Sequence, residues 1–363
     1  MGNQVSKSWF IGLFAGLILC LYIGCTGTTS AKQDKTKKKD VPTKPTCQTN
    51  AILPEGLEAL GDSSYQYVQM QVDFGPRIPE TEPHRLCGDQ LIEWLSTYCD
   101  TVVVQQVQDT LKAFPELQTD SLVKGRNIWA QFNPDITKDR ILLAAHWDTR
   151  PHADQDSTNT NNPNILPFDG ADDGASGVGV LLEIARVLHH LGTDQGVDIL
   201  FFDLEDYGAN DPFTREEINP YCVGSRIWSQ RIAENGLSSQ YSAGILLDMV
   251  GAGDAYFSKE RHSTQYASHV LKEVWCLAKN LGYGKLFVDV SNYAVEDDHL
   301  YVNTIADIPM IDIINYRASA TFADHWHTEK DNMEIIDAKT LHAVRQVVLS
   351  YLFSKSESTE PPA

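Results

Sequence analysis

The sequence predicts a single α/β domain over residues 51–355, with a mixed, mostly parallel central sheet and helices on both of its faces. Apolar runs such as RILLAAH (140–146) and GILLDMV (244–250) are nearly continuous, which is typical of strands buried on both faces. Stretches with helical spacing alternate with these runs, and that alternation indicates a parallel sheet. The 363 residues, 42% of them hydrophobic, are enough for one large domain.

The expected elements follow one another in a regular order. Two helices near 56–72 and 84–98 precede strands at 101–107, 127–132 and 140–148. A helix near 176–192, which ends at a glycine, leads to a strand at 197–206. The remaining elements are helices near 223–236, 259–281 and 337–354, and strands at 243–251, 285–290 and 308–315.

The N-terminus has the pattern of an export and lipid-attachment signal. Lys7 precedes the apolar run WFIGLFAGLILCLYIGC (9–25), which is short for a membrane span and is followed at once by polar sequence. The end of this run, LYIGC, resembles a bacterial lipobox. We therefore expect a signal peptide at 1–24, lipidation at Cys25, and a protein anchored by lipid to the bacterial cell envelope, facing the periplasm. N-myristoylation of MGNQVS and an uncleaved type II anchor remain alternatives.

Charge is distributed unevenly along the chain. Residues 1–50 hold seven lysines and two aspartates, which gives this segment a net charge of +5. Because the whole chain has a net charge of −20, the remaining residues carry −25. We expect a basic, flexible, lipidated tether at 25–50 and a disordered tail at 356–363. The acidic body argues against nucleic-acid binding. Five cysteines follow Cys25 without a C-x-x-C motif, so the sequence leaves their pairing open. We expect a monomer.

Polar residues that can bind metal or move protons follow six apolar runs. They are His146 and Asp148; Asp172 and Asp173; Glu205 and Asp206; Asp248; Asp297, Asp298 and His299; and His325 and His327. Each alone has an ordinary explanation, such as a helix cap or a solvated loop acid. Together they would converge if the runs end at one edge of a sheet, and a histidine with several carboxylates is a suitable zinc shell.

Five separated motifs resemble one enzyme family. AHWD, GADDGASGVG, LED and WHT have the order of the zinc-dependent exopeptidases of the M28 clan. FGPRIPETEPHRLCGDQL (74–91), AHWDTRP (145–151), LLDMVGA (246–252), EDDHLYV (296–302) and HWHTEKDN (325–332) are similar to its glutaminyl-peptide cyclotransferase branch. The resemblance covers residues 53–352 and implies an enzyme that cyclises the N-terminal glutamine of peptides and proteins, with release of ammonia.

The resemblance also implies residue roles. Asp173, Asp206 and His327 match the ligands of a single zinc ion, although Asp206 stands where animal members have glutamate. Glu205 matches the general acid/base, Asp248 and Asp297 the carboxylates near the substrate amide, and Trp326 the aromatic side chain that borders the pocket. Asp248 and Asp297 are expected to share a proton, which would keep Asp248 from binding a second ion.

Two other functions remain open. His146 and Asp248 occupy positions where related di-zinc aminopeptidases bind a second ion, so peptide-bond hydrolysis is one alternative. A non-catalytic lipoprotein that uses the fold as a binding module is the other.

Overall fold

A six-stranded sheet, in the order β1-β2-β4-β3-β7-β10, forms the centre of the computed structural model. Its strands are β1 (Thr101–Leu111), β2 (Ser121–Phe132), β3 (Arg140–His146), β4 (Val197–Phe202), β7 (Tyr241–Asp248) and β10 (Met310–Ile314). Strands β4, β3, β7 and β10 are parallel, whereas β2 pairs antiparallel with β1 and β4. The predicted mixed, mostly parallel sheet is confirmed.

The structure describes residues 49–112, 121–156, 166–210, 217–317 and 321–356. The predicted signal peptide, Cys25, nearly all of the tether and residues 357–363 lie outside these ranges. No helix within the described ranges combines the length and the apolar character needed to cross a membrane.

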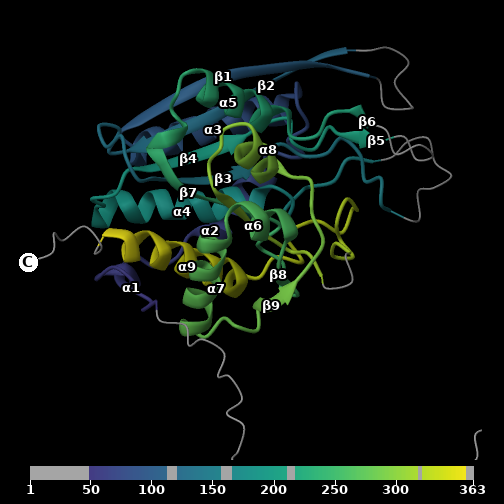
Figure 1. Ribbon diagram of the computed structural model, residues 1–363. Helices are drawn as coiled ribbons and strands as arrows, with labels where there is room; N and C mark the ends of the chain where they lie inside the picture. The colour runs from purple at the N-terminus through teal and green to yellow at the C-terminus, as the bar shows by residue number, and fades with distance from the viewer. Residues whose placement is uncertain (1–48, 113–120, 157–165, 211–216, 318–320, 357–363) are drawn as a thin grey trace, which may run out of the picture. The chain divides into compact units, whose positions relative to one another are not determined.

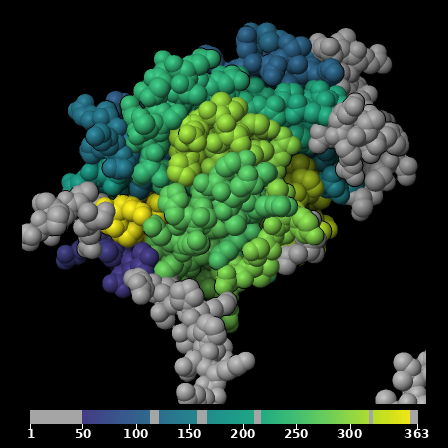
Figure 2. Space-filling model, in the orientation of Figure 1, coloured from purple at the N-terminus to yellow at the C-terminus, as the bar shows by residue number. Residues whose placement is uncertain are grey.

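Helices cover both faces of the sheet (Figure 1). One face carries α1 (Leu57–Leu60), α2 (Ser64–Val72), α3 (Glu82–Tyr98), α4 (Ala175–Leu191), α7 (Ser268–Asn280) and α9 (Ala338–Ser356). The other carries α5 (Val223–Glu234) and α8 (Asp298–Thr304), while α6 (Arg261–Tyr266) lies beside β10. The face seen in Figure 2 is formed largely by the segment from α5 to α8, in green and yellow-green.

The buried strands explain the continuous apolar runs. Successive side chains of a strand point to opposite faces, so a strand covered on both sides must be apolar throughout. In β3, Ile141 and Leu143 pack into the core under α4, whereas Leu142 and Ala144 pack into the core under α5 and α8.

The second half of the chain differs from the expectation in its details. The helix expected near 259–281 is two helices, α6 and α7, because Ala267 between them leaves the helical conformation with φ −131° and ψ 39°. Helix α8 was not expected, since Asp297, Asp298 and His299 were interpreted only as polar residues that follow an apolar run. Two small sheets, β5 (Ala209–Asn210) with β6 (Glu217–Asn219) and β8 (Phe257–Lys259) with β9 (Phe287–Ser291), and a short 3-10 helix (Ser238–Gln240) complete the described elements.

One end of the sheet holds a closed polar cluster. Asp198, inside β4, is fully buried and is paired with the guanidinium of Arg140, which is also buried. Trp129 Nε1 donates to Asp198 at 3.0 Å, and Tyr241 donates to it as well. Because a buried charge is tolerated when it is paired and hydrogen-bonded, this cluster needs no ligand.

Glu260 joins the start of α6, the segment at Val295 and helix α8. Its carboxylate accepts hydrogen bonds from the backbone N–H groups of His262 and Ser263, which caps α6, and from Val295 N at 3.2 Å. His299 Nε2, on α8, lies 3.0 Å from the same carboxylate. Burial opposes ionisation of Glu260, but the hydrogen bonds and charge of His299 and the two backbone donors outweigh it and hold the pKa at about 2.

We predict that Gly177→Ala destabilises the protein. Gly177 lies where α4 crosses β7, and a Cβ there would be 2.2 Å from the carbonyl oxygen of Leu247. Relieving that clash must move helix and strand apart, at about 2 kcal/mol in the free energy of unfolding. Urea denaturation measures this. Gly284→Ala is the matched control, because a Cβ at Gly284 meets no atom closer than 3.9 Å.

We also predict that Glu260→Gln removes a pH-dependent part of the stability. Since the folded-state pKa of Glu260 is depressed from 4.5 to about 2, its contribution is present above pH 4.5 and is lost as the pH falls toward 2. Wild type should exceed the variant by roughly 2–3 kcal/mol at pH 6, and the difference should shrink across that window. Glu234→Gln, an exposed substitution at the end of α5, controls for the loss of one charge. A difference that stays constant with pH would contradict the prediction.

Candidate active site

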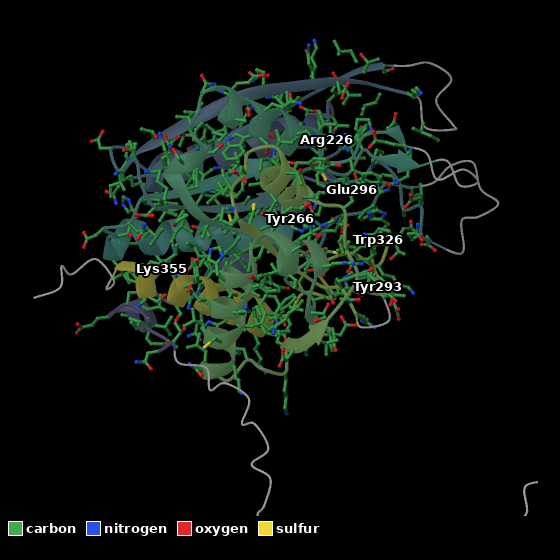
Figure 3. All side chains as sticks on the ribbon, viewed as in Figure 1. Arg226, Tyr266, Tyr293, Glu296, Trp326 and Lys355 are labelled. Carbon is green, nitrogen blue, oxygen red and sulfur yellow. The ribbon has the colours of Figure 1, made fainter. Side chains whose placement is uncertain are left out.

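The predicted site residues gather in a narrow cavity at the carboxyl ends of β3, β4 and β7. Its volume is about 70 Å³. It is lined by Asp173, Glu205, Asp206, Tyr221, Asp248, Met249, Val295, Glu296, Asp297, Ile314, Phe322, Trp326 and His327. In Figure 3, Glu296 and Trp326 lie on the same side of the molecule, at this cavity. Ligands of open α/β sheets bind at this kind of edge.

Asp173, Asp206 and His327 form a group that fits a zinc ion. Asp173 precedes α4, Asp206 lies beyond the end of β4, and His327 belongs to the segment between β10 and α9. One donor atom of each lies within 4.8 Å of the others, and all three are buried. Asp206 Oδ2 is buried without a hydrogen-bond partner among the described residues, as expected for an atom that needs a cation. Three donors with one open position are typical of catalytic zinc.

Two residues outside the predicted set orient this group. Asp154 Oδ1 lies 3.1 Å from His327 Nδ1, which leaves Nε2 facing Asp206 at 3.3 Å and Asp173 at 3.5 Å. Arg150 Nη1 lies 3.3 Å from Asp206 Oδ1, and its Nη2 donates to Asp154. A carboxylate on the distal nitrogen of a histidine is the usual support of a metal ligand.

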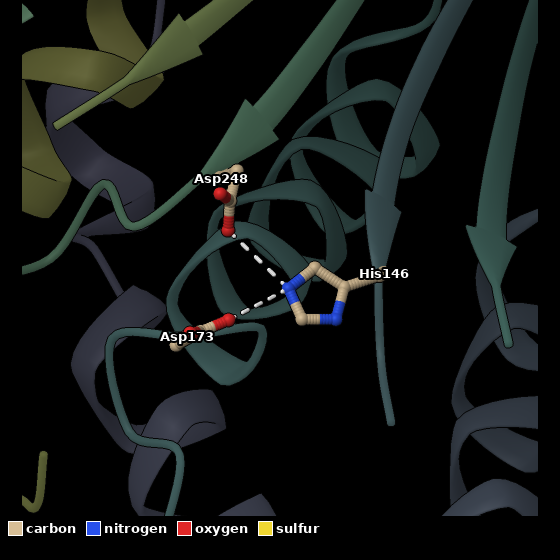
Figure 4. Close-up of side chains that lie close together, drawn as sticks. All are labelled: His146, Asp173 and Asp248. Carbon is tan, nitrogen blue, oxygen red and sulfur yellow. Dashed lines mark hydrogen bonds and ion pairs between the residues drawn. The ribbon is translucent and has the colours of Figure 1, made fainter. Parts of the chain in front are cut away.

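His146 and Asp248 form a second group that shares Asp173. His146 Nε2 lies 3.0 Å from Asp173 Oδ1 and 3.3 Å from Asp248 Oδ1, so both carboxylates approach the same ring nitrogen (Figure 4). Asp173 therefore faces His146 with one oxygen and His327 with the other. Burial raises the pKa of Asp248 to about 8, against the hydrogen bond from His146. The carboxyl of Asp248 thus tends to keep its proton at neutral pH.

Glu205 lies next to Asp206 and reaches the same cavity. Its backbone N–H donates to Asp148 Oδ1 at 3.1 Å, and the N–H of Asp206 lies 3.3 Å from Asp148 Oδ2. One buried carboxylate therefore fixes both residues of the Glu-Asp pair. Burial and the neighbouring charge of Asp206 raise the pKa of Glu205 well above its usual value. A carboxyl with a raised pKa can both accept and donate a proton near neutral pH.

Asp297 lines the cavity together with Asp248 and also lies close to Asp312, which the sequence did not single out. It is the N-cap of α8 and accepts from the N–H of Asp298 at 2.5 Å. No hydrogen bond joins it to Asp248 within the described residues, and its charge acts on Asp248 only through space. The carboxyl of Asp312, from β10, faces Asp297 instead. Burial and the charge of Asp297 raise the pKa of Asp312 well above its usual value, so the carboxyl of Asp312 keeps its proton beside Asp297.

An aromatic wall closes one side of the cavity. The ring of Trp326 stacks on that of His327 with centroids 3.9 Å apart, and Phe322 stacks on Trp326 at 4.3 Å. The stack fixes the ring of His327 and offers an apolar face to a bound side chain.

The loop that carries Asp173 is held by the last motif of the sequence. Asp331 Oδ1 accepts from the N–H of Asp172 at 2.7 Å, and its Oδ2 from the N–H of Asp173 at 3.1 Å. His325 Nε2 lies 2.9 Å from Asp172 Oδ2. His325 and Asp172 therefore support the cavity from behind, and the cavity lining does not include them.

Four residues beside the cavity have positive φ although they are not glycine. They are Leu204, Cys222, Met249 and His327, with φ between 48° and 58°. Such conformations cost of order 1 kcal/mol or more and persist where the surrounding structure over-determines them. At these four positions the surrounding contacts hold the backbone in a conformation that non-glycine residues rarely adopt, next to the residues that line the cavity.

The sequence alone did not identify Asp154, Arg150, Asp312 and Cys222 as neighbours of the site. Asp154 and Arg150 follow AHWD closely, but no spacing signals their contact with His327 and Asp206. Asp312 could have been noticed as the one charged residue of the buried strand MIDII. A buried carboxyl in such a strand must find a partner or keep its proton, and Asp312, buried beside Asp297, keeps its proton.

Comparisons with known proteins agree with this geometry. The model of peptidase family M28 matches residues 127–352. The structure of Porphyromonas gingivalis glutaminyl cyclase is 45% identical and superposes with a TM-score of 0.70, covering 81% of this chain and 97% of that one. Bacteroides thetaiotaomicron glutaminyl cyclase, solved with N-acetylhistamine, is 41% identical with a TM-score of 0.72, covering 83% and 99%.

A more distant relative is the glutaminyl-peptide cyclotransferase of Bos taurus, 25% identical over 269 residues. This match spans 62% of the chain and 66% of the bovine enzyme. Since the family model covers most of the chain and the bacterial enzymes match it at 41–45% identity over about four-fifths of its length, the chain belongs to peptidase family M28 and to its glutaminyl-peptide cyclotransferase branch.

Proposed function

We propose that this chain converts the N-terminal glutamine of peptides and proteins to pyroglutamate, as a zinc-dependent acyltransferase. The observation that carries the proposal is one narrow cavity in which Glu205 lies beside the donor set of Asp173, Asp206 and His327. No serine, threonine, cysteine or lysine is among the described residues that line it. Such a site suits a reaction in which the nucleophile belongs to the substrate, as in cyclisation.

Asp173, Asp206 and His327 would hold the zinc ion. Bound zinc supplies a Lewis acid that polarises the γ-carbonyl of glutamine and stabilises the developing oxyanion. The α-amine attacks the γ-carbon, the C–N bond of the carboxamide breaks, and ammonia leaves. Reacting groups that are already tethered need positioning and proton transfer, and no covalent intermediate with the protein.

Glu205 carries the proton. Its carboxylate accepts the proton released by the attacking amine and returns it to the departing nitrogen, so that no net proton is consumed at this residue. The raised pKa supports this role, because a carboxyl titrating closer to neutral pH exchanges protons in both directions. Asp248 and Asp297 orient the amide nitrogen, and Trp326 borders the apolar part of the glutamine side chain.

We propose one tightly bound zinc ion per chain. A second ion would use His146 and Asp248 together with Asp173. Metal ligation requires deprotonated carboxylates, and burial together with the charges of Asp173 and Asp297 raises the pKa of Asp248 to about 8. A second ion would therefore have to displace the proton of Asp248 and that of His146, whose pKa is also raised, beyond the deprotonation of His327 that the first ion requires.

The decisive experiment incubates the protein with a peptide that begins with glutamine and determines the mass of the product. Loss of ammonia alone supports the cyclase, release of free glutamine supports the di-zinc aminopeptidase, and an unchanged peptide supports a binding module.

We predict that Glu205→Gln retains zinc but loses more than 95% of turnover, because an amide keeps the shape but cannot carry the proton (about 10²–10⁴-fold). Substantial residual activity in this variant would exclude Glu205 as the acid/base.

We predict that His327→Ala loses zinc, activity and thermal stability together, since a bound ion stabilises the folded state by mass action. Wild type, exposed to a modest excess of zinc and desalted, should retain one ion per chain, and Asp248→Asn should retain it as well. His342→Ala is the control for the loss of a histidine, because His342 pairs with Asp62 and does not line the cavity, so this variant should retain zinc. Two retained ions per chain would favour the aminopeptidase.

We propose that the protein is exported and anchored by lipid at Cys25. The apolar run before Cys25 and the basic segment after it support this proposal. So does the disulfide of Cys276, because disulfides persist in oxidising compartments such as the periplasm.

Cys25→Ser should move the protein from the membrane fraction to the soluble fraction, because the serine oxygen does not take the thioether-linked lipid. Fractionation in high salt measures this and removes electrostatic binding by the basic segment. Continued association of the variant with membranes would favour an uncleaved anchor.

A further inference from the structure

Cys222 is a buried cysteine beside the cavity. It lies between β6 and α5, is fully buried, and is a free thiol. The sequence marked it only as one of several cysteines without an evident partner.

The thiol contacts the side chain of Glu205. Cys222 Sγ donates to Glu205 Oε1 at 3.3 Å, and the backbone N–H of Cys222 donates to the carbonyl of Glu205 at 2.9 Å. With the bond from Glu205 N to Asp148, the backbone of Glu205 is held from both sides. Within the described residues, the thiol is the donor that reaches its carboxyl.

The same thiol lies between two carboxyls of the cavity. Cys222 Sγ, one oxygen of Glu205 and one oxygen of Asp297 all lie within 4.8 Å of one another. Burial raises the pKa of Cys222 well above its usual value, and the negative charges of Glu205, Asp298 and Asp297 act in the same direction. The sulfur therefore keeps its proton at neutral pH and remains a donor.

We propose that Cys222 is a positioning residue for Glu205. Its S–H group fixes one carboxyl oxygen and leaves the other free to exchange protons with the substrate. An apolar side chain of similar size would fill the same space, so packing alone does not explain why the group that faces the two carboxyls is a thiol. This inference rests on the proposed acid/base role of Glu205.

Three variants of the full chain test the proposal. Cys222→Ala removes the donor, and Cys222→Ser keeps a donor on the same Cβ. Cys87→Ala is the matched control, because Cys87 is also a free, fully buried cysteine, but lies on α3 away from the cavity lining. For each variant, kcat, KM, zinc content and melting temperature are measured.

We expect Cys222→Ala to lower kcat about tenfold with little change in KM, the size of effect that follows from losing one hydrogen bond that orients the reacting group. Zinc content should be unchanged, and Cys222→Ser should recover part of the lost kcat. Cys87→Ala should lower the melting temperature by a similar amount while its kcat stays at the wild-type value.

Three outcomes would overturn the proposal. The first is a wild-type kcat in Cys222→Ala. The second is an equal loss of kcat in Cys222→Ala and Cys222→Ser, which would indicate a packing role. The third is loss of zinc from Cys222→Ala, which would indicate that Cys222 supports the metal site.

A spectroscopic measurement does not depend on turnover. The S–H stretching band of Cys222 is identified in the Raman spectrum as the band absent from Cys222→Ser. If the thiol donates to Glu205, this band shifts to higher frequency in Glu205→Ala, and an unshifted band would overturn the contact. Failure of wild type to cyclise a glutamine peptide would overturn the proposed function instead, and the band shift would still decide whether Cys222 positions Glu205.

Discussion

Crowded carboxyls at one end of the parallel sheet are the constraint on which the rest of the structure depends. Asp173, Glu205, Asp206, Asp248 and Asp297 all reach one cavity of about 70 Å³. Buried carboxylates without counter-charges are too costly to remain ionised, so each must bind a cation, accept hydrogen bonds, or keep its proton. The structure divides them in this way: two face His327 as a metal site, and burial raises the pKa values of the other three.

The two ends of the sheet show what distinguishes a structural polar cluster from a functional one. At one end, Asp198 is enclosed by donors from Arg140, Trp129 and Tyr241, and nothing further is needed. At the other end, Asp206 Oδ2 is buried without a partner among the described residues. Hydrogen-bond donors surround Asp198, whereas Asp206 Oδ2 has none among the described residues, so the cluster around Asp206 can accept a metal ion.

Supporting contacts from distant parts of the chain keep this arrangement rigid. Asp148 holds the backbone of the Glu-Asp pair after β4, and Asp331 holds the loop before α4. Asp154 fixes the ring of His327, and Cys222 contacts the carboxyl of Glu205. Each of these groups uses a hydrogen bond to aim another residue, which is how an active site holds its geometry without a ligand present.

The sequence by itself determined the fold class and the composition of the site. Short apolar runs that alternate with helical spacing indicate parallel strands covered on both faces, and polar residues that follow parallel strands meet at one sheet edge. The strands β3, β4 and β7 and the convergence of His146, Asp206 and Asp248 were therefore predictable. Only the tertiary structure decided the contacts. Asp312 faces Asp297 across elements that share no sequence signal, and Ala267 divides a stretch that reads as one helix. Periodicity reports which face of an element is buried, whereas the partner of a buried carboxyl depends on how separate elements pack in three dimensions.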